Sequence, residues 1–329
     1  KLDEKAPEIM GLEYQSETQL DYAEYFKIYH YDQGITLLEI DMTKGTANDP
    51  EKLAAEAINA ENETGESEDA AKDTELNQST DSKNVKSENA VEEDAAAAGI
   101  SEDGEENLNG ISEEELAAEL YKGNVVKYLI VPEDVEVPVG LEQDMIIVKK
   151  PVDHTYAESD EILNMMKDLD LLDNIAAVGM KSKDCTVSEI ADKMKVKEGE
   201  KNAEVAYAGT ADKLKLKNFV KSEVNLALFT GDILPREDSE ENAAKDTDKI
   251  ADKDSKDTKE TLTVEEKTEQ FEELTEKLAM LGIPVFVDRS SEEKTELGKQ
   301  EWIKVYGVLY GCEELTNEKF DAAVAAAEK

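Results

Sequence analysis

The sequence has few cysteines, few aromatic residues and no long apolar run, and each scarcity removes a class of protein. Only Cys185 and Cys312 occur in 329 residues, which rules out a disulfide scaffold and a cysteine-based zinc site. No apolar stretch approaches the roughly 18 residues of a membrane span. The N-terminus carries no charged-then-apolar signal segment. Composition therefore leaves open a cytosolic protein and one whose leader has been removed.

Basic residues are also scarce. Lys and Arg number 37 against 80 Asp and Glu, a formal net charge of −43. A surplus of this size repels polyanions. We therefore expect neither nucleic acid nor an anionic membrane surface as a partner.

Catalytic motifs are missing as well. The only histidines are His30 and His154, and HExxH, CxxC, GxSxG and Walker-type GxxxxGK[ST] patterns do not occur. His30 is interpreted as an ordinary strand residue, and the two cysteines as inert thiols, with a disulfide as the alternative. The many carboxylates single out no acid–base pair. We predict a protein that is not an enzyme and needs no cofactor.

Two acidic, low-complexity tracts interrupt the chain. No Phe, Trp or Tyr occurs between Ile40 and Tyr121, and a second aromatic-free tract follows Thr230. Such segments bury too little apolar surface to offset chain entropy of roughly 1–2 kcal/mol per residue. We expect insertions over 45–110 and 233–262. They are solvated loops or, alternatively, cation buffers or partner-binding arms. Ser112 and Glu115 predict a capping box that starts a short helix after the first tract.

The remaining chain alternates between strand and helix signals. We expect a β-hairpin over 25–31 and 35–40 with a turn that contains Gly34. Ser159 is the expected N-cap of a helix that carries Ile162, Met165, Met166 and Leu169 on one face. Further strands are expected at 125–131, 145–148, 175–178, 203–208, 224–229 and 283–287, and further helices at 212–222, 264–281, 297–310 and 317–328.

This alternation predicts an α/β fold with a mostly parallel sheet flanked by helices and an N-terminal β-hairpin. The expected division is a tail at 1–20, the hairpin at 21–44, a ligand-binding lobe at 111–232 and 263–296, and the start of a long backbone helix at 297–329. The two acidic insertions separate these parts.

Polar loops are expected to meet where parallel strands end. Ligands of open parallel sheets bind outside the carboxyl ends of the strands. If the strands near 146, 205, 226 and 285 lie side by side, one rim holds basic, aromatic and hydroxyl groups that suit an anionic or metal-chelate ligand. The alternative is that they are loop residues solvating the strand ends. The predicted ligand-binding residues are Lys150, His154, Tyr156, Asp232, Arg289 and Ser290.

The order of these segments resembles a known family. MIIVKKPVDHTYAESDEILNMMKDLDLLDNIAAVG, EKLAMLGIPVFVDRSS and EWIKVYGVLYG are similar to ABC-transporter substrate-binding proteins of the helical-backbone type. These proteins serve ferric siderophores, cobalamin, haem and metals. In that family His154 and Tyr156 fall on the first ligand-side loop and Arg289 on the last loop of the N-terminal lobe. Trp302 lies in the helix that resembles the linker, where it is interpreted as packing against the sheet rather than stacking on a ligand.

The resemblance implies a two-lobed, non-catalytic receptor at the cell surface. Its leader, its lipid-anchored cysteine and its second lobe lie outside this chain, and its partners are a metal-chelate or other small ligand and an ABC permease. The chain departs from the family pattern at 290–298, where a histidine and a proline of related sequences are replaced. The alternative function is an acidic surface or scaffold protein derived from a one-lobed binding protein.

Overall fold

The computed structural model describes residues 2–43, 118–139, 141, 145–197, 200–235 and 262–328. Contacts divide the chain into one unit of 1–53 with 112–329 and a second unit of 54–111, which lies outside the described residues. The predicted insertions fall almost entirely outside them, as do Ser112 and Glu115. Among the described helices, none is long and apolar enough to cross a membrane.

Sheet A contains the predicted hairpin. Its five strands run in the order β1-β2-β3-β4-β5, with antiparallel pairs up to β4 and a parallel β4–β5 pair. The turn between β2 and β3 has two residues with positive φ, Gln33 at 59° and Gly34 at 73°. The hairpin prediction is confirmed. The strands are β1 (Tyr14–Glu17), β2 (Phe26–Tyr31), β3 (Thr36–Asp41), β4 (Val125–Val131) and β5 (Met145–Lys149).

Sheet B is entirely parallel and has the order β10-β9-β6-β7-β8. From β6 the chain steps outward to β7 and β8, and from β9 it steps the other way to β10, so the strand order reverses between β6 and β9. The prediction of a parallel sheet is confirmed for this part. The strands are β6 (Thr155–Ala157), β7 (Ile175–Val178), β8 (Ala206–Tyr207), β9 (Leu226–Thr230) and β10 (Val285–Asp288).

The expected grouping of strands is wrong at one position. The stretch near 146 is β5, which pairs with β4 in sheet A, and its expected place in sheet B is taken by β6. The hairpin therefore belongs to a different sheet from the parallel strands. Both stretches are short and apolar, so local composition does not distinguish their partners; long-range pairing decides between them.

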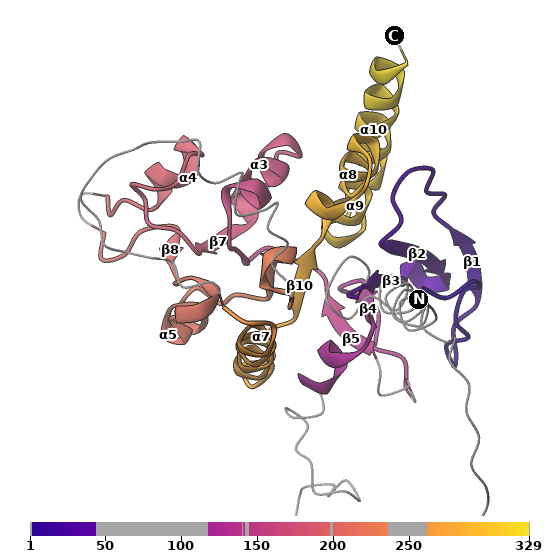
Figure 1. Cartoon of the computed structure of the whole chain (residues 1–329), viewed down its shortest axis with the longest axis horizontal. Coiled ribbons are helices and arrows are strands. Elements are labelled where there is room, and N and C mark those ends of the chain that lie inside the picture. Colours follow the sequence, from indigo (N-terminus) through magenta and orange to yellow (C-terminus); the bar gives the residue numbers. More distant parts are fainter. Residues whose placement is uncertain are drawn as a thin grey trace, which may run out of the picture. The chain divides into compact units, whose positions relative to one another are not determined.

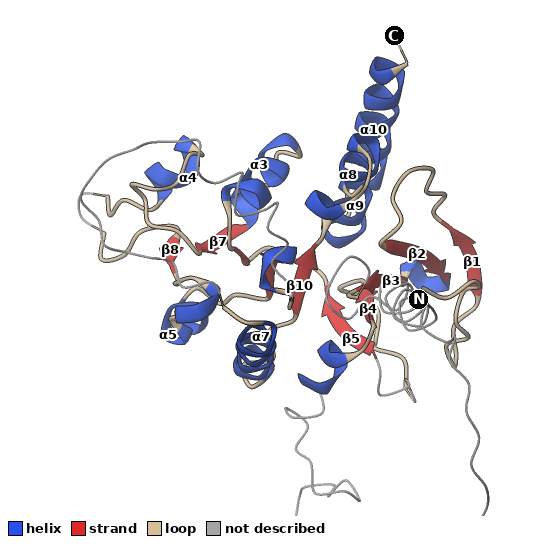
Figure 2. Cartoon of the chain, viewed as in Figure 1, coloured by secondary structure: helices blue, strands red, loops and turns tan. Residues whose placement is uncertain are grey.

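Helices cover both faces of sheet B, with α3 and α4 on one side and α5 and α7 on the other (Figure 1, Figure 2). Ser159 caps α3 through its hydroxyl, which accepts a hydrogen bond from the amide of Ile162 at 3.4 Å, as predicted. Thr263 and Glu266 form a capping box on α7. The helices are α3 (Asp160–Asp168), α4 (Ser188–Lys193), α5 (Leu216–Lys221) and α7 (Val264–Ala279).

Two helix predictions were too long. The segment 212–222 forms a 3₁₀ turn, Ala211–Lys213, and then the short α5, because the amide of Lys215 bonds to the carbonyl of Ala208 instead of continuing a helix. The predicted 264–281 helix ends at Ala279, and Leu281 beyond it is 37% exposed.

The predicted 297–310 helix is two helices, α8 (Glu296–Glu301) and α9 (Ile303–Tyr310), which meet at Trp302. Gly311, with a φ of 73°, ends α9 before α10 (Glu313–Ala327) begins. Trp302 is fully buried with its ring edge-on to Phe26 at 4.9 Å, which confirms the packing interpretation. Its packing joins α8 and α9 to sheet A.

The larger apolar core is shared by the two sheets. The Tyr128 hydroxyl of β4 donates a 2.8 Å hydrogen bond to the carbonyl of Val285 in β10, and the amide of Val285 donates to the Tyr121 hydroxyl at 2.7 Å. The Tyr128 and Phe286 rings lie 5.5 Å apart. Because burial penalises the tyrosinate, the pKa of Tyr128 is raised well above its usual value.

Candidate ligand-binding site

A crevice opens where the strand order of sheet B reverses. Open parallel sheets bind ligands at this position, because neighbouring loops diverge there. The crevice has a volume of about 390 Å³, and its lining comes from the segments that follow β6, β7, β8 and β9. The lining residues are Glu158, Ser159, Gly179, Met180, Lys181, Asp184, Tyr207, Thr210, Thr230 and Asp232.

The floor of the crevice depends on glycine. The fully buried Tyr156 donates its hydroxyl hydrogen to the carbonyl of Gly209 at 2.8 Å. A Cβ on Gly179 would lie 2.6 Å from the carbonyl oxygen of Glu158 and 2.8 Å from the Tyr156 hydroxyl. Strand β7 can therefore approach the end of β6 only without a side chain at this position.

We expect Gly179→Ala to lower the free energy of unfolding by about 1–3 kcal/mol, the usual cost of overpacking. The added methyl must push away the backbone at Glu158, which cannot rotate aside. Urea denaturation of the full chain measures the loss. A variant as stable as the parent would show that the β6–β7 approach is looser than the structure indicates.

Glu158 is the central acid of the crevice. It follows β6, and its Oε2 accepts a 3.2 Å hydrogen bond from the amide of Thr230 at the end of β9. Burial raises the pKa of Glu158 to about 7, the Thr230 amide opposes the shift, and the nearby Asp232 adds to it. Glu158 therefore changes charge near neutral pH.

Carboxylates also surround the first turn of α3. A helix N-terminus in this position ordinarily attracts anions. Here Asp160 and Glu161 occupy that turn. Burial raises the pKa of Glu161, and Asp288 and Asp232 raise it further. Lys181 is the one basic side chain that the structure describes in the lining. The crevice is therefore electrostatically unsuited to an anion and suited to a positive or hydrogen-donating group.

The structure disperses the predicted site residues. Asp232 lines the crevice, and Tyr156 lies under its floor inside β6 rather than on a loop. His154 precedes β6, where its backbone amide donates to Asn225 Oδ1 at 3.2 Å, so it lies at the amino end of the parallel strands, away from the crevice. Lys150 follows β5 in sheet A. The predicted common rim is therefore wrong for His154 and Lys150, because sheet B begins only at Thr155.

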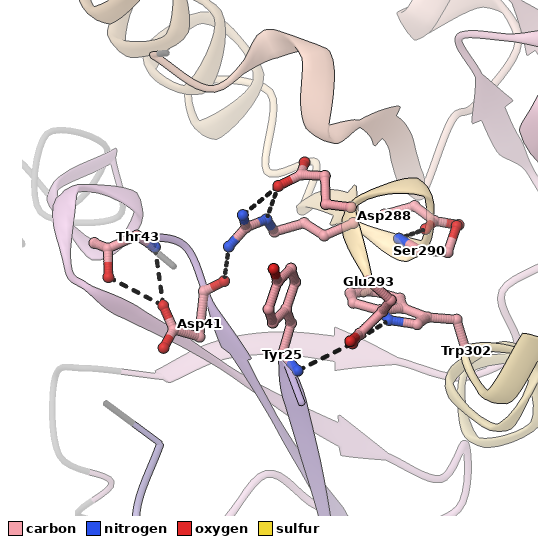
Figure 3. Close-up of polar contacts among 9 residues, drawn as sticks. Tyr25, Asp41, Thr43, Asp288, Ser290, Glu293 and Trp302 are labelled. Carbon is pink, nitrogen blue, oxygen red and sulfur yellow. Dashed lines mark hydrogen bonds and ion pairs between the residues drawn. The ribbon is translucent and has the colours of Figure 1, made fainter. Parts of the chain in front are cut away.

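Arg289 and Ser290 do follow β10 at the carboxyl end of the parallel strands, as expected, but both are buried. Arg289 is 0% exposed; its Nε donates to Glu292 Oε2 at 2.9 Å, its Nη1 donates to the carbonyl of Asp41, and its guanidinium lies 4.7 Å from the Tyr25 ring. The amide of Ser290 donates to Asp288 at 2.7 Å (Figure 3). Neither residue lines the crevice, so Arg289 does not form the predicted ligand fork here.

Sequence reasoning missed Glu158 and Lys181, and it placed Thr210 and Thr230 at strand ends without including them among the predicted ligand residues. For Glu158 the available signal was the end of β6, a strand of only three residues that ends two positions before the recognised cap Ser159. Identifying that strand would have placed Glu158 at a strand end.

Among the described residues, no three His, Cys, Asp or Glu side chains gather as a metal site. Comparison of the chain with known protein families and with curated proteins found no matching family model and no matching curated protein.

Proposed function

We propose that the chain is the solute-binding component of an ABC importer, which captures an iron-siderophore, corrinoid, haem or related metal chelate and delivers it to a membrane permease. The observation that carries this proposal is the crevice at the reversal point of a parallel sheet. In this proposal the protein acts at the cell surface, held by a lipid anchor, and a second lobe closes over the bound solute.

The lining of the crevice narrows the range of candidate ligands. Glu158 and Asp232 attract a positive charge or accept hydrogen bonds, and Ser159, Thr210 and Thr230 add hydroxyl groups. A chelate with net negative charge would be repelled by the same carboxylates. The ligand is therefore a solute with an ammonium group or several hydrogen-bond donors, and a metal-bearing ligand is a cationic or neutral chelate.

A ligand panel tests this proposal. The full chain is heated with a cationic ferric hydroxamate, an anionic ferric catecholate, haem, cobalamin or spermidine. A ligand that binds only the folded state stabilises it by about 2.7 kcal/mol at 100 times its Kd, so the melting temperature must rise with ligand concentration. We expect a rise with a cationic member. Flat curves across the panel contradict the solute-binding proposal, and a response to the catecholate alone contradicts the charge preference.

The charge of Glu158 is expected to make the affinity for a cationic ligand depend on pH. Binding of a cation is expected to strengthen between pH 6 and pH 8, because Glu158, with its pKa raised to about 7, loses its proton in this range. Glu158→Gln is expected to bind about tenfold more weakly at pH 8, a difference of about 1.4 kcal/mol, and to lose the pH dependence. Isothermal titration calorimetry measures both.

Glu204→Gln is the matched control, since Glu204 does not line the crevice and pairs with Lys193 at 3.0 Å. It should bind like the parent at both pH values. Equal affinity of Glu158→Gln and the parent at pH 8 would show that the solute does not contact Glu158.

A further inference from the structure

The N-terminal segment 2–12 covers the second face of sheet A. Side chains of β2, β3 and β4 alternate, and one set, including Ile28 and Leu38, faces the core shared with sheet B. The other set forms a smaller apolar cluster with Ile9 of the segment. The other buried members of this cluster, from β2 to β5 and the turn before β3, are Tyr29, Tyr31, Ile35, Leu37, Leu129, Val131 and Met145.

Two tyrosine hydroxyls of β2 hydrogen-bond to the backbone of the segment. The Tyr29 hydroxyl donates to the carbonyl of Asp3 at 3.0 Å, and the Tyr31 hydroxyl donates to the carbonyl of Pro7 at 2.5 Å. Ile9 is 6% exposed, whereas the adjacent Met10 is 73% exposed. A cavity of about 870 Å³ lies between the segment and the sheet. The segment is therefore docked on the sheet without being packed tightly against it.

Under the segment lies a buried carboxyl group. Glu39 of β3 is 0% exposed, and its Oε2 accepts a 3.2 Å hydrogen bond from the amide of Asp3. Its Oε1 has no hydrogen-bond partner among the described residues. The Lys127 ammonium of β4 lies 3.9 Å from that oxygen and 3.3 Å from Asp3 Oδ2. An ionised Glu39 in this position is costly, because Oε1 is buried and accepts no hydrogen bond from the described residues.

The groups around Glu39 set its titration. Asp3 of the segment faces it, with Lys127 from β4 and Tyr29 and Tyr31 from β2. The pKa of Glu39 is raised to about 7: burial contributes most and the Asp3 side chain adds to it, whereas the hydrogen bond from the Asp3 amide and the charge of Lys127 oppose the shift. Two further charges act on these neighbours: Lys27 lowers the pKa of Asp3, and Glu17 raises the pKa of Tyr29.

The sign of the effect follows from these values. With the segment docked, Glu39 keeps its proton up to about pH 7; with the segment released and water at the carboxylate, its pKa returns toward its usual 4.5. Release therefore sheds a proton. Docking is strongest below pH 4.5 and weakens as the pH rises to 7.

We propose that residues 2–12 form a strap whose docking on sheet A depends on pH. Protonated Glu39 keeps the strap docked in acid. Ionisation of Glu39 above neutral pH releases the strap and exposes the outer face of sheet A. The strap makes no use of the crevice. Release would bring the apolar side chains of Tyr29, Tyr31, Leu37 and Leu129 into contact with solvent.

Two measurements on the full chain test the strap. Hydrogen–deuterium exchange of the 2–12 peptide, corrected for the intrinsic pH dependence of exchange, reports release, and fluorescence of the neutral dye Nile Red reports the exposed apolar face. Between pH 5.5 and pH 7 the opening constant is expected to rise by up to about tenfold per pH unit, the limit for one proton, and then to level off.

Glu39→Gln is neutral at every pH, so its strap is expected to stay docked and both signals to stay flat. Glu8→Gln is the matched control, because Glu8 is an exposed acid of the same segment; it should follow the parent. If Glu39→Gln does not fold, Asp3→Asn takes its place, since loss of the Asp3 charge should shrink the rise. A parent signal independent of pH, or the full rise in Glu39→Gln or in Asp3→Asn, would overturn the proposal.

Discussion

Replacing Arg289 by methionine is expected to lower the free energy of unfolding by about 3–5 kcal/mol, the usual cost of removing one partner of a buried ion pair. Methionine keeps much of the apolar volume beside Tyr25 but leaves the carboxylate of Glu292, which is 9% exposed, without the guanidinium. The carbonyl of Asp41 loses a donor at the same time. Urea denaturation followed by far-UV circular dichroism measures the change.

The double variant Arg289→Met with Glu292→Gln is expected to recover part of this stability, because the uncompensated charge is gone. A Lys294→Met variant is the control, since Lys294 is 62% exposed and pairs with Glu24 on the surface. If Arg289→Met kept its stability but lost solute binding, Arg289 would be a ligand residue, as the sequence suggested. Loss of stability with intact binding would assign it to the sheet junction.

Replacing Glu301 by alanine is also expected to lower the free energy of unfolding by about 3–5 kcal/mol, because it removes a buried, hydrogen-bonded carboxylate. Glu301 is 0% exposed, and its two carboxylate oxygens accept hydrogen bonds from the amides of Asp21, Tyr22 and Ala23 at 3.1, 2.8 and 2.8 Å. Lys304 donates to the same carboxylate at 2.8 Å. Alanine would remove the shared acceptor of three backbone amides, two of which, those of Tyr22 and Ala23, belong to half-buried residues.

Glu296→Ala is the matched control on the same helix, because its side chain is 79% exposed and bonds only to Lys299 in the described contacts. It should change the stability by less than about 0.5 kcal/mol. Glu301→Gln keeps one acceptor oxygen and should fall between the two. Equal stability of Glu301→Ala and Glu296→Ala would mean that residues 21–23 do not depend on α8 for their position.

Glu293, eight residues earlier and just before α8, repeats this arrangement. Its carboxylate accepts from the amides of Glu24 and Tyr25 and from the Trp302 indole at 3.0 Å (Figure 3). Burial raises the pKa of Glu293, whereas these donors lower it. Residues 21–25, which lead directly into β2 of sheet A, are thus attached to the C-terminal segment by two of its acids. Nothing in the local sequence distinguishes these two glutamates from the exposed ones beside them.

Part of the site was predictable and part was not. Ser159 was recognised as a helix cap, and Asp232 was placed at a strand end; both line the crevice. Glu158 was missed because a strand as short as β6 has too few residues for a periodic pattern. Arg289 was placed at the correct end of the strands, but its burial depends on Asp41, a residue 248 positions away in sequence.

The sequence alone determined the α/β class, the hairpin, the capped helix α3 and the lack of recognised catalytic motifs, because these depend on periodicity and on signals within a few residues. Only the tertiary structure decided that β5 and β6 belong to different sheets, that the crevice is lined by carboxylates, and that Arg289, Glu293 and Glu301 are internal. Those outcomes depend on partners far apart in the chain, such as Asp21 and Glu301 at a separation of 280 residues. Local composition carries no record of such partners, so it does not show that Arg289, Glu293 and Glu301 hold Asp41 and residues 21–25 against the C-terminal part of the chain.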